Sequence, residues 1–124
     1  MGVVADKALA QRRAALLIGN RVRYDNALLK AEVAELDHVS GLRYVALIVR
    51  ESKGRASSQS LRVNQLLSSV SYLGEKSVNR MLIRSQIAHG RKIGQLSRRQ
   101  RELLAGLLER RADDKQQRGA TDGC

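Results

Sequence analysis

The fold is decided by residues 61–101, in which three apolar segments are separated by two short turns: LRVNQLLSSVSYLGEKSVNRMLIRSQIAHGRKIGQLSRRQR. The first segment has apolar residues at helical spacing and predicts a short helix: Leu61, Val63, Leu66, Leu67 and Val70. The first turn, residues 71–74, ends on Gly74. In the second turn, residues 87–96, Gly90 and Gly94 bracket Arg91-Lys92.

The helix between these turns is expected from Glu75 to about Gln86, and it has two contrasting faces. Its apolar face consists of Val78, Met81, Leu82 and Ser85. Its opposite face carries three cations at i, i+4 spacing, roughly 150° from the apolar stripe on a helix: Lys76, Arg80 and Arg84.

The last helix is predicted to open at Ser97-Arg98-Arg99-Gln100, because Ser and Gln three residues apart suit a capping box. Four leucines are expected in its buried face: Leu103, Leu104, Leu107 and Leu108. From residue 113 the chain is polar and contains glycine. We expect residues 113–124 to form a disordered tail.

Two helices are predicted before the decisive stretch. A long one covers residues 5–36, with a possible bend near Gly19 and few large apolar side chains in its first half, which we expect to project. The second covers residues 41–51, with Ser40 as its N-cap. Its apolar run is Leu42, Val45, Ala46, Ile48 and Val49. Residues 52–59 are small, polar and cationic, and predict a flexible loop.

The composition predicts an all-α protein. Pro is absent, aromatic residues make up 2% of the chain, and the core must come from Leu, Ile, Val and Ala. At 124 residues the chain is expected to form one structural unit. Its first segment, residues 1–59, contains the long helix, the second helix and the basic loop. The two-turn module follows in residues 60–112, and the tail in residues 113–124.

The charge predicts a polyanionic partner. The net charge is +11, and residues 60–112 alone carry 11 Lys and Arg against 3 Asp and Glu. In the first helix Arg12, Arg23 and Lys30 fall within about 20° of one another at helical geometry. That stripe is either a solvated face or a second nucleic-acid contact.

Several classes of function are disfavoured. His38 and His89 lie in separate turns, and no HxxxH, CxxC, carboxylate pair or phosphate-loop lysine is present, so we expect no enzyme, metal, cofactor or small-molecule substrate. Cys124 is the single cysteine. Arg12 and Arg13 oppose a signal peptide, and no apolar run reaches membrane-spanning length, so we expect a cytoplasmic protein without membrane contact.

The first turn has the features of a phosphate site. A glycine before a helix leaves the first amides unpaired at the positive end of the helix dipole. Here the amides of Gly74, Glu75 and Lys76 would face a phosphate. A purely structural turn is the alternative. The cationic helix face and the basic second turn favour phosphate binding over a purely structural turn.

These residues carry a family resemblance. Val63-Asn64-Gln65-Leu66-Leu67, Leu73-Gly74, Ile87-Ala88, Arg91-Lys92 and Leu96-Ser97-Arg98-Arg99-Gln100-Arg101 resemble the actinobacterial integration host factor, a helical nucleoid-associated protein with a helix-two-turns-helix module. The resemblance covers roughly residues 5–111 and is most specific over residues 62–101.

The resemblance implies architectural binding of double-stranded DNA with little sequence specificity, in the nucleoid and as a monomer. In the family's pattern the hairpin amides around Leu73-Gly74 hold a phosphate, and Arg91 and Lys92 reach the neighbouring backbone or groove. Together with the charge, this assigns nine nucleic-acid-binding residues: Leu73, Gly74, Glu75, Lys76, Arg80, Arg84, Arg91, Lys92 and Arg98.

Three positions depart from the family's pattern. Glu75 stands where a Lys usually follows the hairpin glycine, Ser71 where a Pro opens the hairpin, and Gly94 where a third Arg is usual. Glu75 suits a helix N-terminus but repels a phosphate. These departures favour a divergent, phage-borne relative over a housekeeping copy.

Two alternative functions are open. The same module occurs in a small-subunit ribosomal protein, so RNA is a second possible partner. The short acidic tail disfavours this reading, because the ribosomal chain has a long basic extension. A helical adaptor is the third possibility, with the long first helix pairing with another helix through Leu16, Val22, Leu29 and Val33.

Overall fold

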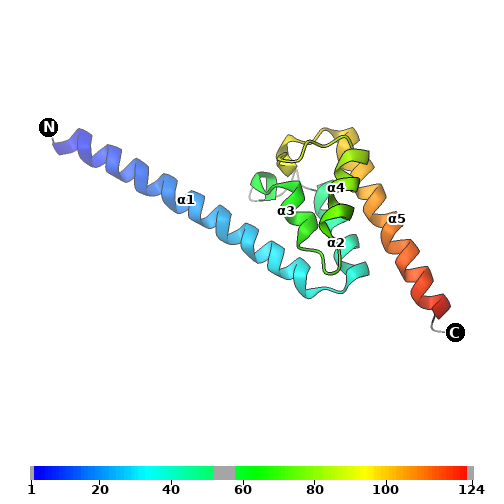
Figure 1. Ribbon diagram of the computed structural model, residues 1–124. Coiled ribbons are helices and arrows are strands. Elements are labelled where there is room, and N and C mark those ends of the chain that lie inside the picture. The colour runs from blue at the N-terminus through cyan, green and yellow to red at the C-terminus, as the bar shows by residue number, and fades with distance from the viewer. Residues whose placement is uncertain (1, 52–57, 123–124) are drawn as a thin grey trace.

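The computed structural model describes residues 2–51 and 58–122, with side chains over residues 9–51 and 58–118, and this part of the chain is all-helical. Five α-helices follow one another (Figure 1): α1 (Gly2–Glu35), α2 (His38–Glu51), α3 (Val63–Ser68), α4 (Glu75–Arg84) and α5 (Arg98–Asp122). Two short 3-10 helices, η2 (Ser58–Ser60) and η3 (Ile93–Gln95), lie in the connections. The rest of the expected basic loop, residues 52–57, lies outside the described residues.

The core is built around the packing of α2 against α5, with α3 and α4 completing it. The predicted apolar run of α2 is confirmed, since all five of its members are buried. The prediction for α5 is half wrong. Leu104 and Leu108 are buried, but Leu107 is half-buried and Leu103 is 38% exposed. Ala105 and Ala112 are buried instead, because small side chains allow the close approach of α2.

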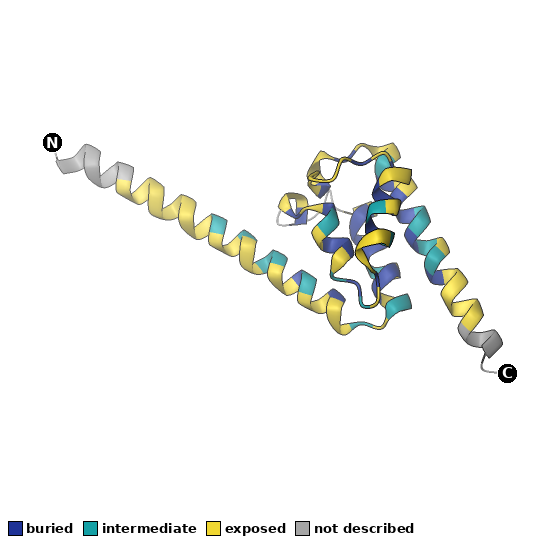
Figure 2. Ribbon diagram, viewed as in Figure 1, coloured by how far each residue is buried: buried dark blue, intermediate teal, exposed yellow. Residues whose placement is uncertain are grey.

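The first half of α1 projects from the rest of the molecule, as expected (Figure 1). The helix is continuous from Gly2 to Glu35, so Gly19 does not interrupt it. Near its end Leu29 and Val33 are buried, whereas Leu9 and Leu16 are 49% and 60% exposed (Figures 1 and 2). Over the described residues, neither this helix nor any other has the apolar length needed to cross a membrane.

The second helix begins three residues earlier than predicted, at His38, and Ser40 is not its N-cap. The preceding residue, Asp37, takes that role. Its carboxylate accepts a hydrogen bond from the backbone N–H of Ser40 at 2.7 Å, and its carbonyl accepts one from Gly41 at 2.8 Å. The hydrogen bond from Ser40 lowers the pKa of Asp37.

The last helix runs through the expected boundary at residue 112 to Asp122, so the prediction of a disordered tail is wrong over residues 113–122. Arg43 of α2 donates to Asp113 at 2.8 Å and to Gln116 at 2.7 Å, and this holds the extra turns. The Lys, Arg and Gln residues of this segment also have good helix propensity. Residues 123–124 lie outside the described residues.

The start of α5 confirms the predicted capping box. The Ser97 N–H donates to Gln100 Oε1 at 2.9 Å, and the Gln100 N–H donates to Ser97 Oγ at 3.1 Å. Gln100 also donates through Nε2 to the carbonyl of Gln86 at 2.8 Å. This bond fixes the beginning of α5 to the end of α4, and it places Arg98 at that end of α4.

Candidate nucleic-acid interface

The hairpin before α4 differs from expectation in the residue that makes the turn. Gly74 has φ −75° and ψ 162°, which any residue adopts, and a Cβ added there would meet nothing within 4 Å. The left-handed conformation falls instead on Tyr72, with φ 65°. That side chain is 92% exposed at the hairpin and was missed by the sequence reasoning, because Tyr is not a residue that favours positive φ.

The hairpin is anchored to the junction between α1 and α2. His38 Nδ1 donates to the carbonyl of Ser71 at 2.6 Å, and Ser71 Oγ donates to the carbonyl of Ala34 at 2.9 Å. Leu73 is buried and its N–H donates to Val70, so this residue supports the turn from within. The hydrogen bonds of His38 and Ser71 join residues far apart in the sequence and hold the turn in one place.

The amides at the start of α4 are open. Among the described residues, no acceptor receives a hydrogen bond from the N–H of Gly74, Glu75 or Lys76, and the helix has no side-chain cap. All three residues are exposed. The helix dipole adds a partial positive charge at this end, and Glu75 opposes part of it.

A row of cations runs along α4 from the hairpin to the second turn. Lys76, Arg80 and Arg84 are exposed, while Val78, Met81 and Leu82 are buried on the opposite face together with Ser85. Eight residues of helix span about 12 Å. The two turns therefore lie at opposite ends of α4, and the cationic row connects them.

The second turn is joined to the segment before α3. Arg62 and Lys92 form an isolated antiparallel bridge, in which Val63 N–H donates to Arg91 at 3.0 Å and Ile93 N–H donates to Leu61 at 2.9 Å. This pairing brings Arg62 beside Arg91 and Lys92, and all three are exposed. The sequence reasoning missed Arg62, since no local pattern indicates a pairing across thirty residues.

Two further residues shape the second turn from inside. Arg101 is 8% exposed and donates to the carbonyl of Ile93 at 3.2 Å and to that of Leu96 at 3.4 Å. Gly94 packs on Gln59, where an added Cβ would lie 3.0 Å from the Gln59 carbonyl oxygen. Arg101 is thus a structural residue here, and close packing explains the glycine at position 94.

The three cations expected to form a stripe on α1, Arg12, Arg23 and Lys30, do not share one surface. Arg23 and Lys30 line a shallow hollow together with Arg62, between α1 and the start of α3. Arg12 lies on the projecting half of the helix and is exposed. Arg23 and Lys30 therefore adjoin the bridge at the second turn, whereas Arg12 does not.

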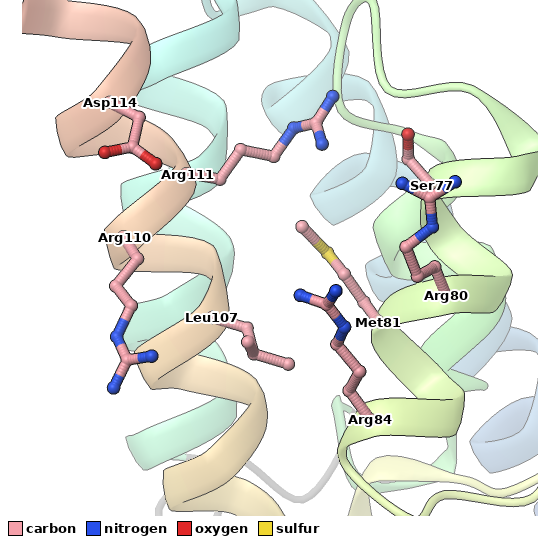
Figure 3. A pocket seen from close by; sticks show the side chains of 8 residues that line it. All are labelled: Ser77, Arg80, Met81, Arg84, Leu107, Arg110, Arg111 and Asp114. Carbon is pink, nitrogen blue, oxygen red and sulfur yellow. The ribbon is translucent and has the colours of Figure 1, made fainter.

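A cleft between α4 and α5 gathers cations that the sequence reasoning did not connect (Figure 3). Its lining is Ser77, Arg80, Met81, Arg84, Leu107, Arg110, Arg111 and Asp114, and an adjoining hollow adds Lys115 and Arg118. The expected break at residue 112 separated Arg110 and Arg111 from Lys115 and Arg118, which were assigned to a disordered tail. Their spacing along a continuous helix was the signal that could have found them. Arg91, Lys92 and Arg98 do not line the cleft.

The two sides of α5 differ in charge. Glu102 and Glu109 form ion pairs with Arg50, and Asp113 with Arg43, so three of its carboxylates face α2. The hydrogen bond that Arg50 donates to Glu109 raises the pKa of Arg50. Over residues 9–51 and 58–118, no ion pair is formed by any of the cations on the other side: Arg80, Arg84, Arg110, Arg111, Lys115 and Arg118.

Comparisons with known proteins found no matching family model, no matching curated protein and no matching solved structure. In the part of the chain that the structure describes, no group of three or more His, Cys, Asp or Glu side chains is placed to hold a metal ion. The functional conclusion therefore depends on the geometry and charge described above.

Proposed function

We propose that this chain binds double-stranded DNA with little sequence specificity, as an architectural, nucleoid-associated protein. The observation that carries the proposal is the row of Lys76, Arg80 and Arg84, exposed and without an acidic partner among the described residues, which runs from the open amides of the hairpin to the cationic second turn. Phosphate contacts supply most of the affinity of such binders and carry no sequence information.

Each part of the surface has its own role in the proposal. The open amides of Gly74, Glu75 and Lys76 position one phosphate, because backbone donors at a helix N-terminus suit an anion. Arg84 and Arg98 continue the contact at the other end of α4. Arg91 and Lys92, joined by Arg62, reach the next stretch of the backbone.

The resemblance to the actinobacterial integration host factor is part of this proposal, as is a helix-two-turns-helix arrangement of α3, α4, α5 and the connections between them. We also propose that the protein acts as a monomer. Tyr72 adds an exposed aromatic ring beside the phosphate position, where it can contact a sugar or base.

The test is an electrophoretic titration of duplex DNA at several salt concentrations. If about six cations neutralise phosphates, the affinity should fall by a factor on the order of a thousand between low and moderately high salt. Binding to no duplex at low salt would refute the proposal. Structured RNA, added as competitor, should be bound less tightly than duplex DNA; the opposite order would favour the RNA-binding alternative.

We expect Arg91→Ala to weaken DNA binding to a similar extent on all duplex sequences, because a phosphate contact reads no bases. The measurement is the dissociation constant for several unrelated duplexes. A loss confined to one sequence would mean that Arg91 reads base edges. Arg99→Ala is the matched control, since Arg99 is exposed on α5 and lies outside the proposed surface.

An adaptor function is the second candidate, favoured by exposed apolar residues of α1, although Leu29 and Val33 of the pairing face expected from the sequence are buried in the core. Leu16, Leu17 and Ile18 are 60%, 69% and 68% exposed on the projecting half of this helix. A stable dimer in light scattering, combined with no affinity for DNA, would favour this function over the proposed one.

A further inference from the structure

We propose that the cleft between α4 and α5 binds a compact anion with two or three linked phosphate groups. The site goes beyond the proposed DNA surface and does not require it, because four of its six cations come from α5 residues outside that surface. Six cations line the cleft and its adjoining hollow: Arg80, Arg84, Arg110, Arg111, Lys115 and Arg118.

The charge of the cleft is not balanced within the protein. Six cations face one carboxylate, Asp114, which leaves a net charge of +5 for the lining. The other carboxylates that could compensate on α5 are engaged with α2, where Glu109 pairs with Arg50 and Asp113 with Arg43. Gathering like charges in a concave site is unfavourable unless an anion occupies it.

A buried donor in the cleft also lacks an acceptor. Arg111 Nε is buried and has no hydrogen-bond partner among the described residues. Arg84 and Arg111 extend from opposite walls into the space between the helices (Figure 3). In a ligand with linked phosphates, one phosphate oxygen could accept from Arg111 and an oxygen of the next phosphate from Arg84.

The dimensions favour a small, linear ligand. The part of the cleft near Arg84 has a volume of about 250 Å³, and the adjoining hollow near Arg118 has about 330 Å³. Packed helices lie only about 8–10 Å apart, so the groove between them admits a row of single groups but not a duplex. Planar guanidinium groups on both walls match the oxygens of successive phosphates.

Two kinds of ligand carry such linked phosphate groups: inorganic triphosphate and a nucleoside triphosphate. At one end of the cleft Met81 and Leu107 form an apolar patch between the arginines (Figure 3). A nucleobase could pack there, whereas inorganic triphosphate gains nothing from it. The relative affinity of the two ligands distinguishes these possibilities.

The test is isothermal titration calorimetry of the full chain with sodium triphosphate and, separately, ATP, in a low-salt buffer without phosphate. Arg110 and Arg118 are exposed, so the double variant Arg110→Gln/Arg118→Gln should keep the fold. We expect its dissociation constant for triphosphate to rise at least about tenfold. The control Arg13→Gln/Arg99→Gln makes the same charge change at exposed sites outside the cleft, and should stay within about twofold of wild type.

Arg111→Gln tests the buried donor. It should weaken triphosphate binding by about tenfold or more, with the melting temperature measured to confirm that the variant is folded. Equal affinity for both ligands would show that the site binds the phosphates alone, and tighter binding of ATP would show that the apolar patch contributes. Binding of neither ligand, or equal loss in the cleft and control variants, would overturn the proposal.

The two proposals can fail separately. Arg91→Ala/Lys92→Ala should weaken DNA binding and leave the affinity for triphosphate within about twofold, since neither residue lines the cleft. A wild-type chain that binds triphosphate but no DNA would refute only the proposed function. If Arg110→Gln/Arg118→Gln weakens DNA binding and not triphosphate binding, the cleft belongs to the DNA surface and the inference is wrong.

Discussion

Gly90 and Gly94 bracket the same cationic turn, but their surroundings differ. A Cβ on Gly94 would lie 3.0 Å from both Cβ and the carbonyl oxygen of Gln59, whereas a Cβ on Gly90 would meet nothing within 4 Å. The backbone of η2 cannot move away from Gly94 without disturbing the bridge between Arg62 and Lys92 that follows it. Of these two glycines, only Gly94 is therefore required by the packing of the turn against Gln59.

We expect Gly94→Ala to reduce the free energy of unfolding by about 1–3 kcal/mol, because the added methyl group overlaps backbone atoms. Gly90→Ala is the matched control, and it should be neutral or stabilise by up to about 1 kcal/mol by restricting the unfolded chain. Urea unfolding of the two variants measures the difference. Equal stability would contradict the close approach to Gln59.

In the hairpin, the residue with the turn conformation is not the glycine that the sequence suggested. Tyr72 occupies the left-handed conformation, which costs a residue other than glycine roughly 1–2 kcal/mol, and Gly74 occupies an ordinary one. The absence of a side chain at Gly74 has no structural reason in the hairpin. In the proposed function it leaves room for a phosphate at the open amides.

Gly74→Ala tests this interpretation. The variant should keep its stability within about 1 kcal/mol, since alanine adopts the observed φ and ψ and meets no neighbour. Its affinity for duplex DNA should fall several-fold on all sequences, because the methyl group obstructs close approach to the amides. Filter binding with two unrelated duplexes measures this. Unchanged affinity would remove the hairpin from the interface.

At the scale of elements, the start of α2 depends on one ionised side chain. Asp37 accepts a hydrogen bond from the Ser40 N–H, and this bond lowers the pKa of Asp37 below its ordinary value of 3.8. The cap therefore stabilises the fold fully above pH 3.8. Its contribution is lost as the pH falls through the lowered pKa.

We expect Asp37→Asn to remove this pH dependence, because asparagine keeps an acceptor at the N-cap but does not titrate. Between about pH 5 and pH 2 the unfolding free energy of wild type should fall more steeply than that of the variant. Chemical denaturation at several pH values gives both slopes. Parallel slopes would mean that the cap does not depend on the charge of Asp37.

At the scale of the whole molecule, α1 divides into an anchored half and a projecting half. Its last turns bury Leu29 and Val33, and Asn26 donates to Ser60 at 3.0 Å, whereas residues 9–18 are exposed throughout. The projecting half is free to reach DNA or a partner helix. It contributes little to the core (Figure 2).

A chain that lacks residues 2–17 should consequently unfold within a few degrees of the full chain, because residues 9–17, whose side chains the structure describes, are all exposed. Thermal unfolding followed by circular dichroism measures this, and the same chain tests whether Arg12 and Arg13 contribute to DNA affinity. A large drop in melting temperature would show that the first half of α1 packs against something in solution.

The presence of the helices and the buried faces of α2 and α4 could be predicted because their causes are local. Apolar spacing is enough to define the buried face of α2 and of α4, and Ser97 with Gln100 is enough to start α5. The open amides at the start of α4 also have a local cause, since a helix N-terminus without a capping side chain leaves backbone donors unpaired.

The arrangement of the charges was decided by tertiary structure. Arg62 meets Lys92 through a backbone bridge, and α5 continues past residue 112 with Arg43 holding Asp113 and Gln116. No local pattern carries such contacts, because they join residues that are 30 and about 70 positions apart. The sequence alone determined an all-helical, strongly cationic chain. Packing of α5 against α2 and α4 decided which cations are paired and which line the open cleft, since each helix turns only one face to a given neighbour.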